Sequence, residues 1–347
     1  MTDRLSLPDL GPAESFVRSS ADPVVAHLVA TRLDRSDGRS TVAPAVAHPP
    51  VADLLRSQRS DGSWGDRDDP PTRVLGTLWS AKVLVDVGLG RLDAVGDGVD
   101  FLHRHATCDP GVFSLDGTRR GVLSCYVGTA GSIAVAADRP DLADEQIRWI
   151  LQHQEVRRSG RSLRSSPTDV WSPELATRYG GCLSETTCLV GLVRTGAALA
   201  DQRDRDVDAG AGDDPEVAAM LTSIRDAFLE REVIRASSGA VVPVGSPAGD
   251  PERWLDPGFP LDWHVDLVEV LDLLGRIGPA DARIQPAIDA LVERRLADGT
   301  WPLRRSHRPG DLKAFGRRSS TRGSALATVR VVSALRRFDA PDASPAR

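Results

Sequence analysis

Residues 54–72 read LLRSQRSDGSWGDRDDPPT and contain a helix end, a tight turn with a tryptophan, and an acidic loop. The apolar residues at the start of this stretch recur at helical spacing, and Asp61-Gly62 is typical of a turn that ends a helix. Beyond the acidic loop, Thr72 is the expected N-cap of a second, apolar helix. The stretch therefore predicts two helices that are joined around Trp64.

The same order of elements recurs near the other end of the chain. Residues 284–303 read IQPAIDALVERRLADGTWPL, and the apolar segment STRGSALATVRVVSALRRF follows at residues 320–338. Weaker copies lie between these two, and the first of them has Phe113 where Trp64 stood. Repetition of a unit of two helices, without strand-like alternation between the copies, predicts an all-α repeat fold.

The helices of these repeats are of two kinds. Those that end in Asp-Gly or Gly carry charges on one face, as half-exposed helices do. Those that start near residues 73, 121, 186, 264 and 322 are rich in Ala, Gly, Val and Leu, which predicts burial on nearly all sides. An inner ring of apolar helices within an outer ring of amphipathic ones gives an α/α toroid of about five to six helical hairpins, with a linear solenoid as the alternative.

The toroid is expected at residues 49–338, as a single domain. Residues 1–48 are expected to form an N-terminal segment whose helix packs on the toroid, and residues 339–347 a disordered tail. The connections 157–181 and 235–261 are too long for simple hairpins, and long ordered loops are commonly functional. Residues 201–214, DQRDRDVDAGAGDD, are charged and Gly-rich and predict a flexible surface insert.

The composition is that of a soluble globular protein, with 41% hydrophobic and 27% charged residues. A net charge of −6 argues against nucleic acid as a partner, because binding to phosphates needs a basic face. The longest uncharged run, residues 122–137, is too short to span a bilayer, so no transmembrane segment is predicted. The chain has four cysteines without a CxxC pattern, and a cytoplasmic location is expected.

The tryptophan turn resembles the QW motif of the squalene and hopene cyclases. Residues 58–64 (QRSDGSW) carry the resemblance, and residues 297–303 (ADGTWPL) are similar, although Arg295 replaces the glutamine. Class II diterpene cyclases and the β subunits of protein prenyltransferases share the same toroid, so the resemblance implies that fold over most of the chain. Gln58, Trp64 and Trp301 are expected to be structural, because a glutamine satisfies backbone groups at a helix end and a tryptophan covers that end.

The resemblance also gives a meaning to the acidic loop, since Asp66-Arg67-Asp68-Asp69 matches the DxDD motif of class II cyclases. In that family the middle Asp protonates an alkene or epoxide, which would make Asp68 the proton donor beside Asp66 and Asp69. An acid of this kind must be buried beside other carboxylates. The neighbouring Arg67 and the following prolines instead favour a solvated acidic loop, which is the outcome that we expect here.

No cofactor or metal is predicted. The DDxxD pattern that binds magnesium diphosphate in class I terpene synthases is missing, and no cysteine follows an Asp by two residues as in the zinc site of protein prenyltransferases. No Walker loop or GxGxxG motif precedes a helix.

Two further groups of residues are candidates for a site. The segment FPLDWHVDLVEVL (259–271) places Asp262, Trp263, His264 and Asp266 at the start of an inner helix. Asp262 is the expected N-cap, and His264 is a candidate acid or base that either Asp can pair with. The other candidate ligand-binding residues come from the long connections and the third inner helix: Trp171, Tyr179, Cys182, Glu185 and Trp254.

Three functions are compatible with these patterns. The first is a terpene cyclase-like or prenyltransferase-like toroid that binds an apolar, isoprenoid-type ligand in its central cavity, with or without turnover. The second is a non-catalytic module that binds a lipid or a protein. The third is a carbohydrate-active (α/α)6 enzyme that uses paired carboxylates such as Glu174 and Glu185.

Overall fold

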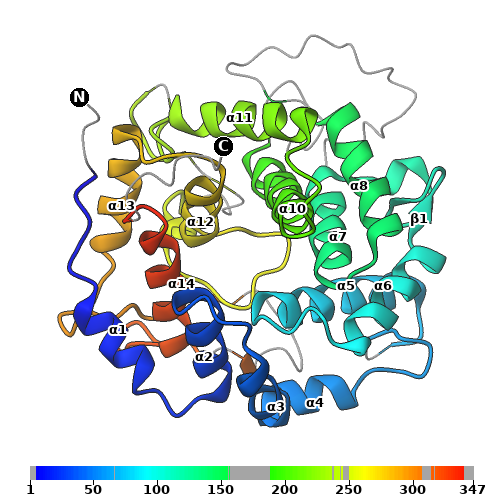
Figure 1. The fold of residues 1–347 in the computed structure, drawn as a ribbon, viewed down its shortest axis with the longest axis horizontal. Coiled ribbons are helices and arrows are strands. Elements are labelled where there is room, and N and C mark those ends of the chain that lie inside the picture. Colours follow the sequence, from blue (N-terminus) through cyan, green and yellow to red (C-terminus); the bar gives the residue numbers. More distant parts are fainter. Residues whose placement is uncertain are drawn as a thin grey trace. The chain divides into compact units, whose positions relative to one another are not determined.

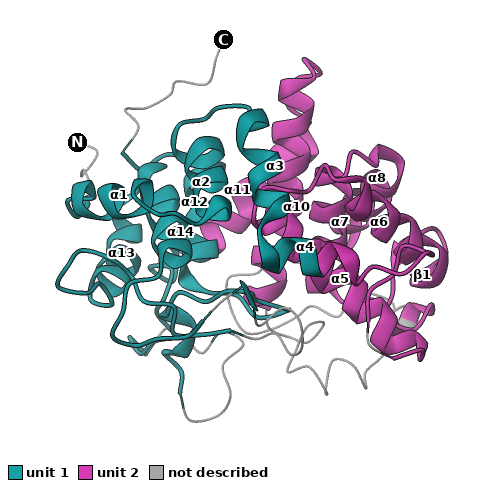
Figure 2. Ribbon diagram, turned by 90° about the horizontal axis from the view of Figure 1, so that it is seen from below, with its two compact units in different colours: residues 1–53, 228–347 teal, residues 54–227 magenta. Residues whose placement is uncertain are grey.

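The computed structural model describes residues 5–65, 67–154, 156, 188–236, 238–242, 244, 250–306, 314–315 and 317–339, with only the backbone for Arg120. The chain divides into two compact units (Figure 2): unit 1 comprises Met1–Asp53 and Phe228–Arg347, and unit 2 comprises Leu54–Ala227. Almost all of the regular structure is helical (Figure 1), which confirms the prediction of an all-α fold. Closure of the helices into one ring stays a prediction.

Unit 2 is built from α5 (Pro70–Asp86), α6 (Asp93–His105), α7 (Ser124–Ala136), α8 (Pro140–His153) and α10 (Leu189–Asp208). A short 3-10 helix, η2, spans Arg119–Gly121. The helices α4 (Pro49–Arg56) and α11 (Pro215–Leu229) cross its two boundaries. The strands β1 (Thr107–Cys108) and β2 (Val112–Phe113) form a two-residue antiparallel hairpin that pairs Thr107 with Phe113 and Cys108 with Val112.

Unit 1 contains α1 (Gly11–Arg18), α2 (Pro23–Leu28), α3 (Arg39–Ala47), α12 (Leu267–Ile277), α13 (Gln285–Val292) and α14 (Ala325–Arg336). Short helical turns complete it: the π-helix η1 (Val29–Leu33) and the 3-10 helices η3 (Arg253–Leu255) and η4 (Ala282–Ile284). Among the described residues, no helix is both long and apolar enough to cross a membrane.

The apolar helices of unit 2 run parallel to one another, as small residues of α7 and α10 show. A Cβ atom added at Gly128 would lie 2.4 Å from the carbonyl carbon of Arg194, and one at Gly131 would lie 3.3 Å from Cβ of Ala198. Positions that advance along α7 therefore meet positions that advance along α10. Because nearly all of α7 is buried, it belongs to the inner kind of helix that the sequence predicted.

In unit 1, the apolar helices α12 and α14 are also parallel, and two ion pairs hold them together. Arg330 pairs with Asp266 at the start of α12, with Nη1 3.0 Å from Oδ2, and Arg337 pairs with Asp272 one and a half turns further along, with Nε 2.6 Å from Oδ1. The two ion pairs advance together along α12 and α14. They fix both the direction and the register of these helices.

Two helix boundaries differ from the prediction. Helix α5 begins at Pro70, and its N-cap is Asp69, which accepts a hydrogen bond from the Thr72 N–H at 3.1 Å. The expected cap at Thr72 was wrong because Pro70 and Pro71 suit the first turn of a helix, where N–H groups have no partner within the helix. Likewise, α10 continues to Asp208, so the expected flexible insert was wrong for its first eight residues. Side chains four residues apart interact along this part of α10, as Gln202 Nε2 donates to Oδ2 of Asp206 at 2.9 Å.

Candidate functional site

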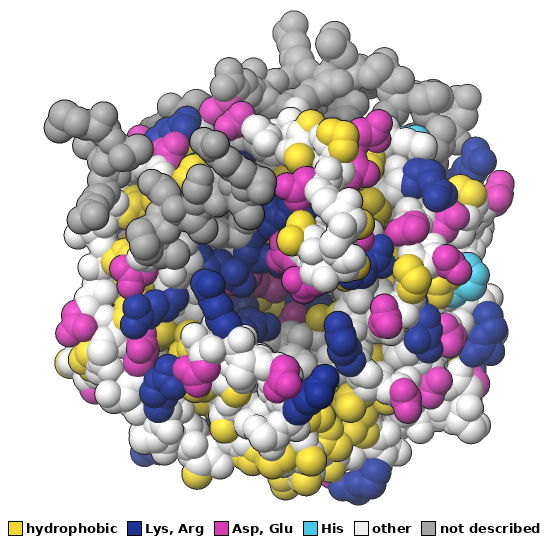
Figure 3. Space-filling model, in the orientation of Figure 1, with side chains coloured by type: hydrophobic (Ala, Val, Ile, Leu, Met, Phe, Trp, Pro, Cys, Tyr) yellow, Lys and Arg dark blue, Asp and Glu magenta, His cyan; other side chains and the backbone are white. Residues whose placement is uncertain are grey.

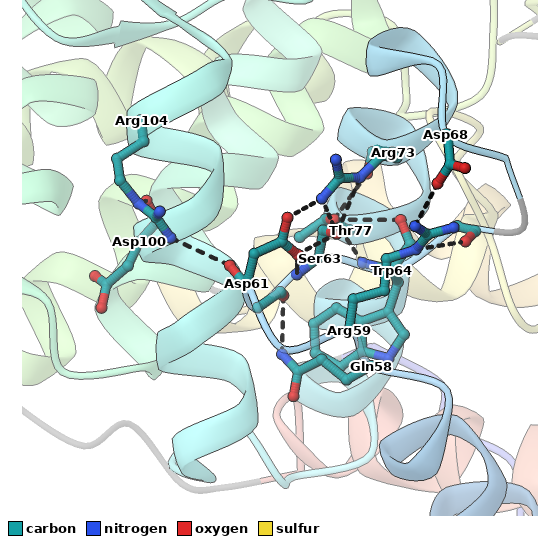
Figure 4. A network of polar contacts seen from close by, with 12 residues as sticks. Gln58, Arg59, Asp61, Ser63, Trp64, Asp68, Arg73, Thr77, Asp100 and Arg104 are labelled. Carbon is teal, nitrogen blue, oxygen red and sulfur yellow. Dashed lines mark hydrogen bonds and ion pairs between the residues drawn. The ribbon is translucent and has the colours of Figure 1, made fainter.

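The first tryptophan turn ties two helices together (Figure 4). Trp64 is 2% exposed, and its Nε1–H donates to the carbonyl of Leu54 at 2.8 Å, in the last turn of α4 where carbonyls lack partners within the helix. Its backbone N–H donates to Oγ1 of Thr77 in α5 at 2.9 Å. Gln58 Nε2 donates to the carbonyls of Gly62 at 2.9 Å and Ala94 at 2.7 Å, which joins the turn to α6. This is the structural arrangement that the sequence predicted.

The second tryptophan turn repeats this geometry. Trp301 is fully buried, and its Nε1–H donates to the carbonyl of Leu291 at 2.8 Å, while its backbone N–H donates to Oγ1 of Thr328 at 3.0 Å. Arg295 stands where the first turn has glutamine, and it donates to the carbonyls of Gly299 at 2.9 Å and Asp9 at 2.7 Å. The arginine therefore replaces the glutamine in function, and it joins this turn to the segment before α1.

Asp61, in the first turn, is held by its neighbours as a carboxylate (Figure 4). Its Oδ1 accepts hydrogen bonds from the backbone and the hydroxyl of Ser63, at 3.1 and 2.7 Å, and its Oδ2 pairs with Arg73. Burial alone would raise the pKa of Asp61, but these hydrogen bonds and the Arg73 charge outweigh burial and hold the pKa well below its ordinary value. The group stabilises the turn and is not available as an acid.

The acidic loop lies in solvent where it is described. The side chain of Asp68 is 90% exposed and pairs with Arg59 (Figure 4), and Asp69 is exposed as the N-cap of α5. The hydroxyl and backbone hydrogen bonds from Thr72 lower the pKa of Asp69. Asp66 lies outside the described residues. Asp68 thus has the solvated environment that the sequence favoured, and the structure does not bring it into a buried carboxylate cluster.

Asp266 is the N-cap of α12, so the expected cap at Asp262 was wrong. Asp266 is completely buried, and its oxygens accept from the backbone N–H groups of Glu269 at 2.9 Å and Gly258 at 2.8 Å, and from Arg330. Asp262 lies four residues too early for this cap because Val265 and Asp266 are still extended or turn residues before the helix. All of the lone-pair directions of Asp266 are committed to structural contacts.

Asp262 and His264 form a buried carboxylate–imidazole pair on the loop before α12. Their side chains are 11% and 16% exposed, and Nδ1 of His264 is in close contact with Oδ1 of Asp262, which also accepts from the His264 backbone N–H at 3.1 Å. Because an ionised carboxylate only accepts hydrogen bonds, Nδ1 of His264 is the donor in this contact. Trp263 stacks on the imidazole, with ring centroids 3.9 Å apart.

The other candidate residues divide into one that is described and four that are not. Trp254 is fully buried, and its Nε1–H donates to the carbonyl of Val242 at 2.7 Å, so it packs the loop between α11 and α12. Four lie outside the described residues: Trp171, Tyr179, Cys182 and Glu185. Their predicted role in ligand binding stays a prediction, as it does for Trp254 and Trp263.

Sequence reasoning missed two buried arginines of this region. Arg330 bonds Asp266 and the carbonyl of Gly258, and Arg305 donates to the carbonyl of Val265 at 3.1 Å. Burial lowers the pKa of the Arg305 guanidinium, while the nearby Asp266 carboxylate acts against this effect. One signal was available: Arg330 interrupts an apolar helix, where a charge must find a buried partner.

A metal centre has no support in the described part of the chain. No group of three or more His, Cys, Asp or Glu side chains is placed there so that it could hold a metal ion. The thiols that are described, Cys108, Cys125 and Cys188, are free. Cys188 instead serves as the N-cap of α10, where its Sγ accepts from the Gly191 N–H at 3.3 Å.

Comparison with known proteins yields remote structural likeness. No model of a known protein family matches the sequence, and neither does a curated protein. Among solved structures, two variants of the type II terpene cyclase MstE from Scytonema, each in complex with geranylgeranyl dihydroxybenzoate, align over 91% of this chain and 98% of theirs, with 13% identity and a TM-score of 0.33. A protein from Actinoplanes aligns over 83% of this chain and 97% of its own, with 15% identity and the same TM-score. Likeness at this level carries no argument about what this chain binds or does.

Proposed function

We propose that the chain binds an apolar, isoprenoid-type ligand and that the Asp262–His264 pair moves a proton on it. The observation that supports this proposal is the buried carboxylate–imidazole pair beside the stacked ring of Trp263. The pair lies on the loop before α12, which begins with the buried residues Leu267 and Val268, so that acid–base groups and apolar side chains are close in sequence. The resemblance of the tryptophan turns to the QW motif supports the isoprenoid class of ligand.

The chemistry of the pair follows from its hydrogen bond. The Asp262 carboxylate holds Nδ1–H of His264, which fixes the tautomer and stabilises the imidazolium that forms when Nε2 takes a proton. An imidazolium is far too weak an acid to protonate an isolated alkene. We therefore expect removal or return of a proton at an activated carbon or heteroatom, rather than a cyclisation that starts from protonation of an alkene.

Asp68 in the acidic loop is a poorer candidate for a proton-transfer group than the Asp262–His264 pair. Asp68 is 90% exposed and paired with Arg59, so it lacks the buried surroundings and the carboxylate neighbours that a proton donor of the class II type needs. This observation also favours a second candidate function, in which the chain binds a lipid without turnover.

The test combines binding and turnover. Intrinsic tryptophan fluorescence should change saturably with geranylgeraniol or squalene, and less with a straight-chain alkane of similar length. His264→Gln should keep this binding and lower any turnover by roughly 10²–10⁴-fold, the usual contribution of a positioned acid or base. Asp68→Asn is the matched control and should change neither.

The outcomes separate the candidates. Binding without any product from the wild type identifies a binding module. Loss of turnover in Asp68→Asn, with the fold intact, would make the chain a class II cyclase and end the proposal for His264. Binding of oligosaccharides in place of polyprenyl compounds would support the carbohydrate-active alternative.

A further inference from the structure

We propose that a cavity in unit 1, between α1, η1 and the end of α14, binds a small molecule through its phosphate group. The cavity has a volume of about 270 Å³. Five arginines line it: Arg18, Arg32, Arg35, Arg336 and Arg337. This site is separate from the Asp262–His264 pair, and the proposal does not depend on the function proposed above.

The lining is rich in guanidinium groups. Five of them line the cavity beside two carboxylates, Glu14 and Asp339. Two further carboxylates, Asp34 and Asp272, pair with the lining residues Arg18 and Arg337. Over the outer part of the face drawn in Figure 3, basic and acidic side chains are interspersed. The cavity therefore gathers guanidinium groups held in ion pairs, and an anion of more than one charge can compete for those pairs that are exposed.

The arginines that have carboxylate partners keep donors for a ligand. Arg336 pairs with Glu14 and with Asp339, the latter at 2.8 Å, and Arg18 pairs with Asp34 at 2.7 Å. The side chains of Arg18 and Arg336 are 46% and 47% exposed, so these ion pairs contribute little and compete weakly with a dianion. A guanidinium has five N–H donors, and a two-pronged carboxylate contact uses only two of them.

Arg35 is the residue that most clearly points to a ligand. Its φ angle is +51°, a left-handed conformation that disfavours any residue with a Cβ atom. No hydrogen bond or ion pair joins its side chain to another residue in the described part of the chain. This conformation ends the helical segment, because the Ser36 N–H donates to the Ala30 carbonyl at 2.9 Å, and it leaves the exposed guanidinium of Arg35 at the cavity wall, where a ligand can reach it.

The backbone before Arg35 is unusual as well. Residues Val29–Leu33 form a π-helical turn, closed by the bond from the Asp34 N–H to the Val29 carbonyl at 3.0 Å. Such turns are rare and occur frequently at functional sites. The extra residue of the turn redirects the chain that follows, and both Arg32, within the turn, and Arg35, just after it, reach the same cavity.

The chemistry of the lining favours phosphate over other anions. A guanidinium group binds two oxygens of a phosphate in a bidentate contact. Five guanidinium groups offer more donors than the two oxygens of a carboxylate can use, whereas a phosphate has more oxygens and a second negative charge. The volume leaves room for a phosphate and a small organic group. Free phosphate, a phosphate monoester and a diphosphate share this chemistry, and the experiment below distinguishes them.

Isothermal titration calorimetry of the full chain at constant ionic strength tests the site. Inorganic phosphate, pyrophosphate and glycerol 3-phosphate are titrated separately, and the tightest of them identifies the class. Arg35→Gln should weaken that binding roughly tenfold or more, as expected for one charge-assisted hydrogen bond. Arg91→Gln removes an exposed arginine from unit 2 and is the matched control, for which binding should stay unchanged.

A second variant separates binding from folding. Arg35→Gly should raise the midpoint of thermal unfolding, because glycine adopts a φ of +51° without strain, and should weaken phosphate binding as much as Arg35→Gln. The proposal is overturned if the wild type shows no saturable binding of any of the three compounds. Equal weakening by Arg91→Gln would also overturn it, since the effect would then come from net charge alone.

Discussion

Gln58 and Arg295 show how two different side chains can serve one structural role. Each stands six residues before a tryptophan and donates to the carbonyl of the turn glycine. Each also donates to a second, distant carbonyl: that of Ala94 in α6 for Gln58, and that of Asp9 before α1 for Arg295. What the position requires is two N–H donors on a side chain long enough to span both carbonyls. A match by residue identity finds only the first copy, whereas a match by hydrogen-bonding capacity finds both.

Asp61 gives the turn a dependence on pH. Its pKa is lower in the folded chain than in the unfolded chain, so its stabilisation is complete above about pH 5 and is lost as the pH falls through the folded pKa. We expect Asp61→Asn to lower the free energy of unfolding at pH 7, and its difference from the wild type to narrow as the pH falls below about 4. Urea unfolding between about pH 7 and pH 3 measures this difference.

The matched control for this experiment is Asp213→Asn, in an exposed segment before α11. It should change the free energy of unfolding little at either pH. A constant gap between Asp61→Asn and the wild type over the whole range would show that the carboxylate charge plays no part.

At the level of elements, close approach of helices depends on single glycines. A Cβ atom at Gly128 would meet backbone atoms of Arg194 and Thr195 in α10 at 2.4 to 2.6 Å, and backbone cannot move aside as a side chain can. We expect Gly128→Ala to cost roughly 1–3 kcal/mol in the free energy of unfolding, as overpacking commonly does. Chemical denaturation with a two-state fit measures it.

Gly131→Ala is the control in the same helix. Its Cβ atom would meet only side chains, the nearest at 3.3 Å, and the gain in helix propensity offsets the crowding. The free energy of unfolding should therefore stay close to that of the wild type. A Gly128→Ala variant as stable as the wild type would show that α7 and α10 do not approach this closely.

The sequence predicted the helices better than their ends or their partners. The start of each apolar helix was placed within a few residues, because composition and periodicity report burial directly. Thr72 and Asp262 were wrong as caps, since Thr, Asp and Ser are equally suitable and only the backbone decides between neighbours. The Asp266–Arg330 pair was out of reach because it joins residues that are 64 positions apart.

The candidate site was predicted in part for the same reason. Contacts between residues close in sequence can be predicted from the sequence. The pairing of His264 with Asp262, two residues away, was one of two alternatives that the sequence left open. The arginine-lined cavity could not be predicted from the sequence, because its residues come from both ends of the chain and have no motif in common. Only the fold brings Arg35 near Arg336.

For the whole molecule, the contact of α1 with α14 is decisive, since it holds the two ends of the chain together within unit 1. Val17 is 1% exposed on the buried side of α1. We expect Val17→Asp to cost roughly 3 kcal/mol or more and to lower the unfolding midpoint by about 6–12 °C, because an unpaired charge would be buried there. Differential scanning fluorimetry measures the midpoint.

Ser15→Asp is the control, because the same charge is then placed on the exposed face of the same helix. It should leave the midpoint nearly unchanged. Limited proteolysis adds a local readout: Val17→Asp should admit cleavage within residues 5–18, and Ser15→Asp should not. A normal midpoint for Val17→Asp would mean that α1 contributes nothing to the stability of unit 1.

The joining of α1 to α14 also sets an order of events on the ribosome. Residues 5–53 emerge first, yet α14 is synthesised roughly 15–60 s later at typical rates of 5–20 residues per second. Unit 2 is continuous in sequence and can fold during that interval, while the apolar sides of α1 and α2 stay exposed until α14 has been made. The nascent N-terminal segment is therefore the part of this chain that most needs a chaperone, and slowing of translation before residue 325 would lengthen that need.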